Sequence, residues 1–179
     1  MAPSRDLLTD SDLPYAELQA AALDGDVFRV DRAFCSIAEF DVPWRRAAAL
    51  RPLFGRTWVV ARRSAAWVWG GLDDAPLTHD GFGPKAGRDL ALPTELRASD
   101  VHLGEGDVVS FEGVRVTSPV RTVVDLARSE EWGIGEEGVV RALVSEHRVG
   151  RASCDALLAR HTRLPHARRA RERLDGVFG

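Results

Sequence analysis

Arg121 and Asp125 are the residues whose types and spacing most directly indicate chemistry. They stand four positions apart in the run 116–128, VTSPVRTVVDLAR. On a helix this spacing places a guanidinium and a carboxylate on one face, where they form an ion pair. Ser118 precedes Arg121 by three residues and adds a hydroxyl, which needs an activating base to act as a nucleophile. No histidine lies in this run, so it predicts an ion pair and no catalytic serine.

The same run contains the signals that end a strand and begin a helix. Residues 114–117 alternate between apolar and polar at period two, as a strand does. Ser118 is a preferred N-cap residue, and Pro119 suits the first helical position because its missing N–H has no intrahelical partner there. Beside the ion pair, the helix is expected to bury an apolar stripe of Val120, Val123, Val124 and Ala127.

Arginines in two other segments have the chemistry of phosphate contacts, because a guanidinium is a planar donor fork that matches phosphate oxygens. Residues 42–72 hold six arginines and no acidic residue, and tryptophans are interleaved with them. Residues 164–174 are also basic. The predicted DNA-binding residues are Arg45, Arg46, Arg62, Arg63, Arg168, Arg169 and Arg171. The alternative is that the tryptophans are core anchors, that the arginines coat the domain, and that the C-terminal cations sit at a solvated helix end.

An acidic segment precedes the first basic one. Residues 1–41 contain nine acidic residues and three arginines, within a chain whose net charge is −3. Such a layout either presents an electropositive face to a nucleic acid, or lets the two segments neutralise each other across a domain contact.

The elements along the chain predict an α+β fold of two parts, a short module at 1–41 and a domain at 42–179. The module should hold a helix at 14–23 and a hairpin whose strands, 27–30 and 33–37, meet at Asp31-Arg32. A winged helix-turn-helix also needs a supporting helix, and residues 1–12 are short and acidic, so the module is expected to be a partial winged helix.

The domain at 42–179 should form a central mixed or antiparallel sheet covered by a C-terminal helical layer. We expect strands at 57–60, 77–82, 96–101, 108–111 and 114–116, with an exposed loop over 81–93. We expect helices at 43–50, 65–69 with Ser64 as its cap, 119–131, 135–147, 151–161 and 165–175.

Composition excludes several classes of protein. The chain is 45% hydrophobic and 28% charged, lacks a membrane-length apolar run and lacks an apolar N-terminal stretch, so we expect a soluble cytoplasmic protein. Cys35 and Cys154 lie far apart, which favours buried reduced thiols. The five histidines have no metal-ligand spacing, so no metal or other cofactor is expected. No set of nucleophile and base or of paired carboxylates assembles, and we expect no catalytic residues and no enzymatic activity.

The run 116–128 resembles the C-terminal antitoxin domain of the AbiEi family, the antitoxin half of bacterial type IV toxin–antitoxin pairs, in which a V-T-S-P-x-R-T-x-x-D-L-A segment recurs. The matching motif residues are Thr117, Ser118, Pro119, Arg121, Thr122 and Asp125. Shorter stretches at 13–25, 65–70 and 164–170 fit the same pattern. The resemblance implies a DNA-binding regulator with an N-terminal winged helix, which represses its own operon and counteracts a nucleotidyltransferase-like toxin.

Two other functions stay open from the sequence. One is a non-enzymatic protein-interaction module that retains the antitoxin-like domain without operator reading. The other is a self-associating scaffold with the tryptophans at its interface.

Overall fold

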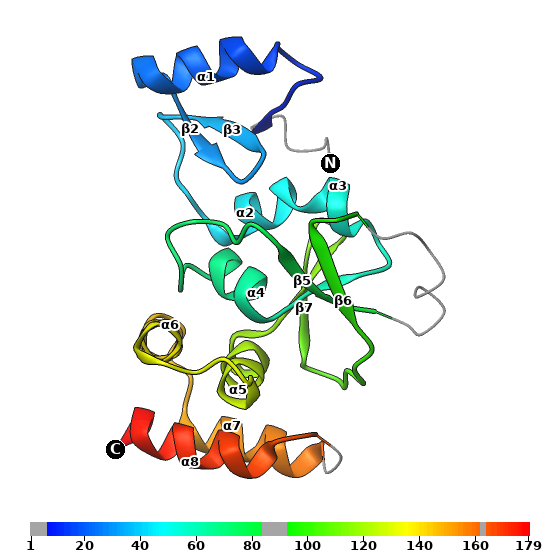
Figure 1. Ribbon diagram of the computed structural model, residues 1–179, viewed down its shortest axis with the longest axis vertical. Coiled ribbons are helices and arrows are strands. Elements are labelled where there is room, and N and C mark those ends of the chain that lie inside the picture. The colour runs from blue at the N-terminus through cyan, green and yellow to red at the C-terminus, as the bar shows by residue number, and fades with distance from the viewer. Residues whose placement is uncertain (1–6, 84–92, 162–163) are drawn as a thin grey trace.

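The elements stack in three layers along the long axis of the molecule. The computed structural model describes residues 7–83, 93–161 and 164–179, and in these ranges the chain has an α+β fold, as predicted. Figure 1 shows an N-terminal unit at one end, a sheet with short helices in the middle, and the C-terminal helices at the other end. Most of the loop predicted at 81–93 lies outside the described residues.

The N-terminal unit consists of β1 (Leu7–Leu8), α1 (Tyr15–Asp24), β2 (Val27–Val30) and β3 (Ala33–Ser36). Its strands form an antiparallel sheet in the order β1-β3-β2. The hairpin turns at Asp31-Arg32 as predicted, and Asp31 adopts the left-handed backbone (φ 55°) that tight hairpin turns require. The helix ends at Gly25, whose φ of 82° makes it a left-handed C-cap.

The central layer is a mixed sheet in the order β6-β5-β4-β8-β7. Strand β4 runs parallel to β8, and β5 runs parallel to β6, while the other neighbours are antiparallel. The strands are β4 (Val59–Val60), β5 (His79–Phe82), β6 (Leu96–Ser99), β7 (Val108–Phe111) and β8 (Val114–Thr117). The helices of this layer are α2 (Pro43–Ala49), α3 (Arg51–Phe54) and α4 (Arg62–Val68).

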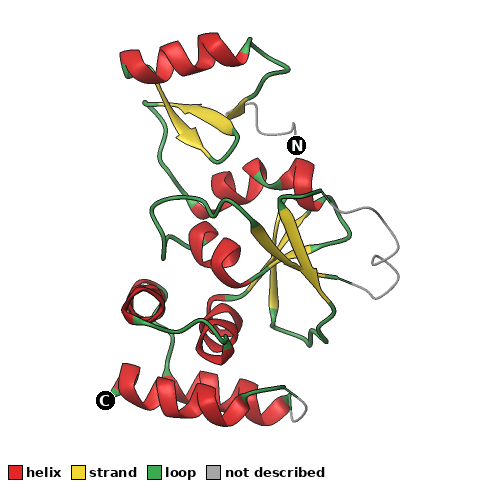
Figure 2. Cartoon of the chain, viewed as in Figure 1, coloured by secondary structure: helices red, strands yellow, loops and turns green. Residues whose placement is uncertain are grey.

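The C-terminal layer follows β8 directly and is helical (Figure 2). Its helices are α5 (Pro119–Arg128), α6 (Ile134–Glu146), α7 (Arg151–Arg160) and α8 (Ala167–Phe178). The Ser118 hydroxyl accepts a hydrogen bond from the Arg121 backbone N–H at 3.4 Å, which confirms the predicted cap of α5. In the described part of the chain, no helix is both long and apolar enough to cross a bilayer.

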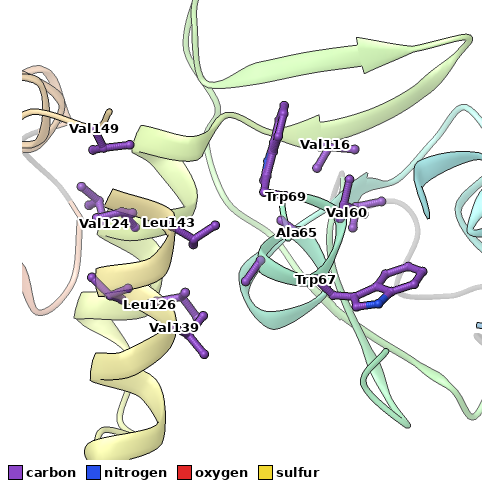
Figure 3. Close-up of a cluster of buried hydrophobic side chains, with 14 of the residues drawn as sticks. Val60, Ala65, Trp67, Trp69, Val116, Val124, Leu126, Val139, Leu143 and Val149 are labelled. Atoms are coloured by element: carbon purple, nitrogen blue, oxygen red, sulfur yellow. The ribbon is translucent and has the colours of Figure 1, made fainter. Parts of the chain in front are cut away.

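The larger of two buried hydrophobic clusters joins the sheet to the helices (Figure 3). Trp69, at the end of α4, lies between Val116 of β8 and Leu143 of α6 in this cluster. Trp58, Trp67 and Trp69 are all buried. The core-anchor interpretation is therefore confirmed for these three tryptophans, whose rings fill the interior of the monomer, whereas Trp44 is only half-buried.

Ser64 does not cap α4. The helix begins two residues earlier, at Arg62. The Ser64 hydroxyl is fully buried and accepts a hydrogen bond from the backbone N–H of Asp80 at 2.9 Å. The prediction was wrong because the neighbouring strand β5 supplies a donor that the local sequence does not contain.

Cys35 and Cys154 are buried, and neither forms a disulfide. Burial raises the pKa of the Cys154 thiol to about 11, with a smaller contribution from Asp155. A thiol that resists ionisation is a poor nucleophile, so Cys154 belongs to the packing of α7.

Candidate functional site

A buried ion network surrounds Arg121. Its Nε donates to Asp125 at 2.7 Å, as the four-residue spacing predicts, and its Nη1 donates to Asp107 at 2.7 Å. All three side chains are almost completely buried. Asp107 lies in the turn before β7, so the network ties that turn to α5. The Arg121 guanidinium carbon also lies 5.8 Å from the centre of the Phe82 ring on β5.

Two further arginines extend this network toward the surface. Arg128 donates to Asp125 at 2.7 Å, and Arg160 at the end of α7 donates to Asp107 at 3.1 Å. The network thus sets three guanidinium groups against two carboxylates, which leaves one positive charge in excess. Burial lowers the pKa of Arg128, and the charge of Asp125 opposes this shift. Arg160 is the most exposed of the three arginines, with a side chain that is 53% exposed.

A cleft opens beside the network. Two adjoining cavities of about 460 and 810 Å³ share the lining residues Arg62, Val101, Arg128 and Pro165. We call the joined hollow the arginine cleft, after the arginines of four elements that line it: Arg62 and Arg63 of α4, Arg97, Arg128 and Arg160. Among the described residues that line the larger cavity, three arginines and two histidines face one acidic residue, Asp100.

The smaller cavity is less cationic, because it also contains acidic side chains. Asp80 lies 3.9 Å from Arg62, and burial raises the pKa of the Asp80 carboxyl while Arg62 and Arg97 oppose that shift. Its other acidic residues are Asp125, Glu130, Glu131 and Glu136. Within 7–83, 93–161 and 164–179, no three acidic, histidine or cysteine side chains form a cluster that could hold a metal ion.

Arg62 has an unusual backbone for a side chain on a helix. Its φ is 49°, in the left-handed region that residues other than glycine rarely adopt. Such strain persists where the surrounding structure requires it, often at binding sites. The guanidinium carbon of Arg62 lies 5.5 Å from the centre of the Phe82 ring, so Arg62 and Arg121 both contact this ring.

Arg45 and Arg46 were predicted to bind DNA, and the structure places them elsewhere. Arg45 is 2% exposed and is bound to Glu39 at 2.8 Å and to the carbonyl of Phe40. Arg46 holds Asp41 with both Nε and Nη2, at 2.9 and 2.5 Å. The acidic residues just upstream of α2 fold back onto its arginines, so the two oppositely charged segments neutralise each other here.

The other predicted arginines lie at or near the cleft. Arg62 and Arg63 line it, and Arg63 is paired with Glu136 of α6. Arg168 and Arg171 are exposed on α8, Arg169 is half-buried there, and the helix begins just after His166, which also lines the cleft. The structure therefore places Arg62 and Arg63 of the first predicted basic segment at the cleft, and the start of the second segment beside it.

Several lining residues were missed in the sequence analysis. Arg128 stands three residues after Asp125, a helical spacing that could have revealed it. Arg160 and Asp107 have no such local signal, because their contact joins residues that are 53 positions apart.

A serine, a histidine and an aspartate also meet between the N-terminal unit and the sheet. The Ser64 hydroxyl lies 3.1 Å from Nδ1 of His79, whose Nε2 lies 3.4 Å from Asp31. This resembles a hydrolase triad in composition, but the Ser64 hydroxyl is fully buried and accepts from Asp80 N–H, so no substrate can reach it. With the Arg32–Glu95 ion pair at 2.7 Å, the contact docks the hairpin turn on β5 and β6.

The motif residues of α5 thus hold the fold together at the wall of the cleft, which Arg62, Arg97 and Arg160 also line. Comparison with known proteins adds no assignment to this geometry. The chain matches no protein-family model, and no significant match to a curated protein was found.

Proposed function

We propose that the chain is a non-enzymatic, DNA-binding regulator of the AbiEi antitoxin type, and that it contacts the DNA backbone in the arginine cleft. The larger cavity carries the proposal, because three arginines line it with a single acidic residue among the described lining residues. Arg160 stays 53% exposed although it is paired with Asp107. Phosphate oxygens complement guanidinium groups both in charge and in planar geometry.

Backbone contacts fit the arrangement of these arginines better than base reading does. The cleft arginines come from α4, β6, α5 and α7, and no single exposed helix presents them to a groove as a recognition helix would. Contacts of this kind position a protein on DNA and supply affinity that depends strongly on salt.

The DNA proposal predicts that the double variant Arg62→Ala and Arg160→Ala loses phosphate contacts. Binding of the full chain to a duplex from upstream of its own gene should be measured by anisotropy across a salt series. The slope of log affinity against log salt should fall in magnitude by about 2, since each lost contact removes about 1.

The matched control is Arg56→Ala with Arg115→Ala, which removes the same charge from two exposed arginines that do not line the cleft. This control should keep the wild-type slope. An equal fall of the slope in both double variants would contradict a role of the cleft, and a wild-type slope near zero would contradict phosphate contact altogether.

The antitoxin role is supported by the resemblance in the run 116–128. The motif residues of this run lie where β8 enters α5, between the sheet and the helical layer, so the similar segment is central to the architecture. We propose that the partner is a nucleotidyltransferase-like toxin encoded beside this chain.

Expression of a neighbouring nucleotidyltransferase-like reading frame should arrest growth, and co-expression of this chain should restore it. Colony counts under separate inducible promoters measure the effect. The Arg62→Ala, Arg160→Ala variant, tested in parallel, shows whether neutralisation needs the cleft. Growth arrest that persists while the chain accumulates as folded protein would refute the antitoxin role.

A second candidate is a protein-interaction module that does not read DNA. It is favoured by the internal carboxylate partners of Arg45, Arg46 and Arg63, which reduce the number of cations offered to a polyanion. The salt series above separates the candidates, because this module has no affinity for the duplex.

A further inference from the structure

We propose, on the basis of the function proposed above, that phosphate binding in the arginine cleft is coupled to proton uptake by His102 and His161. Binding would then strengthen as the pH falls. Histidine changes its charge between pH 5 and 8, whereas arginine stays charged throughout this range. The two histidines would therefore add a dependence on pH to a site whose arginines have none.

The two histidines lie side by side in the wall of the larger cavity. Both residues line this cavity, and the centres of their rings are 6.1 Å apart. His102 is exposed, whereas His161, at the end of α7, is only 9% exposed. Because both residues belong to the wall, a proton gained by either ring places a positive charge beside an anion in the cavity.

The buried ion network fixes the position of both histidines. The backbone carbonyl of His102 accepts a hydrogen bond from Nη1 of Arg121 at 3.5 Å. Nε2 of His161 lies 2.8 Å from Oδ2 of Asp107, but the contact does not have the geometry of a hydrogen bond. Asp107 already accepts hydrogen bonds from Arg121, from Arg160 and from a backbone N–H. Its negative charge is thus shared among several donors, so a protonated His161 can also stabilise an anion in the cavity.

The other charged groups of this wall leave only a small surplus of positive charge. Those that line the larger cavity or belong to the network beside it are Arg62, Asp100, Asp107, Arg121, Asp125, Arg128 and Arg160. The network has one more guanidinium than carboxylate, and Arg62 lies 3.9 Å from Asp80. Each proton that a histidine gains adds one full charge, so the histidines strongly affect the charge that a phosphate meets.

Phosphate binding and protonation of the histidines favour each other. The negative charge of a phosphate in the cavity favours the charged form of an imidazole in its wall. Because such coupling is reciprocal, the protonated protein must bind the phosphate more tightly than the neutral form does. Side-chain carboxylates mostly stay ionised between pH 8 and 5.5, so a rise in affinity over this range reports on histidine.

The test measures the affinity of the full chain for two phosphate probes between pH 8 and 5.5 at constant ionic strength. One probe is the upstream duplex, labelled with a dye whose emission does not depend on pH and followed by anisotropy. The other is tripolyphosphate, followed by calorimetry in two buffers that differ in ionisation enthalpy. The wild type should bind both probes about tenfold more tightly at pH 5.5 than at pH 8, and the two buffers should reveal proton uptake.

Glutamine variants identify the histidines that are responsible. His102→Gln with His161→Gln should remove most of the rise in affinity at low pH. His102→Gln alone changes an exposed side chain and should remove part of the rise, even if the double variant does not fold. The matched control is His147→Gln, at a histidine outside the cleft whose Nε2 lies 2.7 Å from the Trp69 carbonyl. Glutamine can also donate to this carbonyl, so the control should keep the wild-type rise.

An equal rise in the wild type and in both His102 variants would overturn the coupling, because other groups would then take up the proton. Duplex binding that depends steeply on salt but not on pH would refute the coupling and leave the DNA proposal standing. Tripolyphosphate binding that strengthens at low pH, without any duplex binding, would support the coupling and refute the DNA proposal. A chain that binds neither probe would refute both.

Discussion

Replacement of Arg121 by alanine is expected to lower the free energy of unfolding by about 3–5 kcal/mol, which is the usual cost of removing one partner of a buried ion pair. Asp107 and Asp125 would both stay buried without their shared guanidinium, as each is less than 5% exposed. Urea unfolding followed by tryptophan fluorescence measures the loss, with the midpoint compared at constant slope.

Arg128→Ala is the control for this prediction. Arg128 touches Asp125 from the rim of the cleft and makes no contact with Asp107 in the described residues, so its loss should cost about 1 kcal/mol. Comparable costs for the two variants would mean that the network is not centred on Arg121. A cost below about 1 kcal/mol for Arg121→Ala would show that water replaces the guanidinium easily.

Trp69→Ala is expected to be of similar severity, about 3–5 kcal/mol, because truncating a buried tryptophan leaves a large cavity. The Trp69 ring lies 5.4 Å from Phe111 and 5.2 Å from His147, centre to centre, and it joins β7 to the end of α6. The midpoint temperature of thermal unfolding should be many degrees lower in the variant than in the wild type.

Trp69→Phe separates packing from hydrogen bonding at the same position. The indole Nε1 donates to the Thr117 carbonyl at 2.8 Å, but that carbonyl also accepts from the Thr122 hydroxyl at 3.1 Å. Losing the indole donor should therefore cost only about 1 kcal/mol. If phenylalanine proved as damaging as alanine, the hydrogen bond and not the packed ring would be the main contribution.

The parts of the fold that were predicted from the sequence are those specified by neighbours along the chain. The hairpin of β2 and β3 was predicted because apolar residues alternate on both sides of a two-residue turn. Helix α5 was predicted from its cap and its buried stripe. The strand order β6-β5-β4-β8-β7 has no local signal, because β4 pairs with β8, which follows three other strands in the sequence.

The same distinction applies to the candidate site. The Arg121–Asp125 pair follows from helical spacing, whereas Arg160 reaches Asp107 only through the tertiary fold. Arg45 and Arg46, by contrast, were predicted to bind DNA but are paired within the protein. Their clustering was interpreted as a phosphate surface, but the acidic residues at 39–41 precede them closely enough to fold back and pair with both.

The position of β4 has a consequence for synthesis of the protein. Val59 and Val60 pair with Arg115 and Val116 on one side, so a nascent chain that stops short of this partner leaves that edge of the strand without hydrogen bonds. An open apolar edge invites intermolecular pairing. We therefore expect truncations that end before residue 117 to accumulate as aggregates, which sedimentation of the expressed fragments would measure.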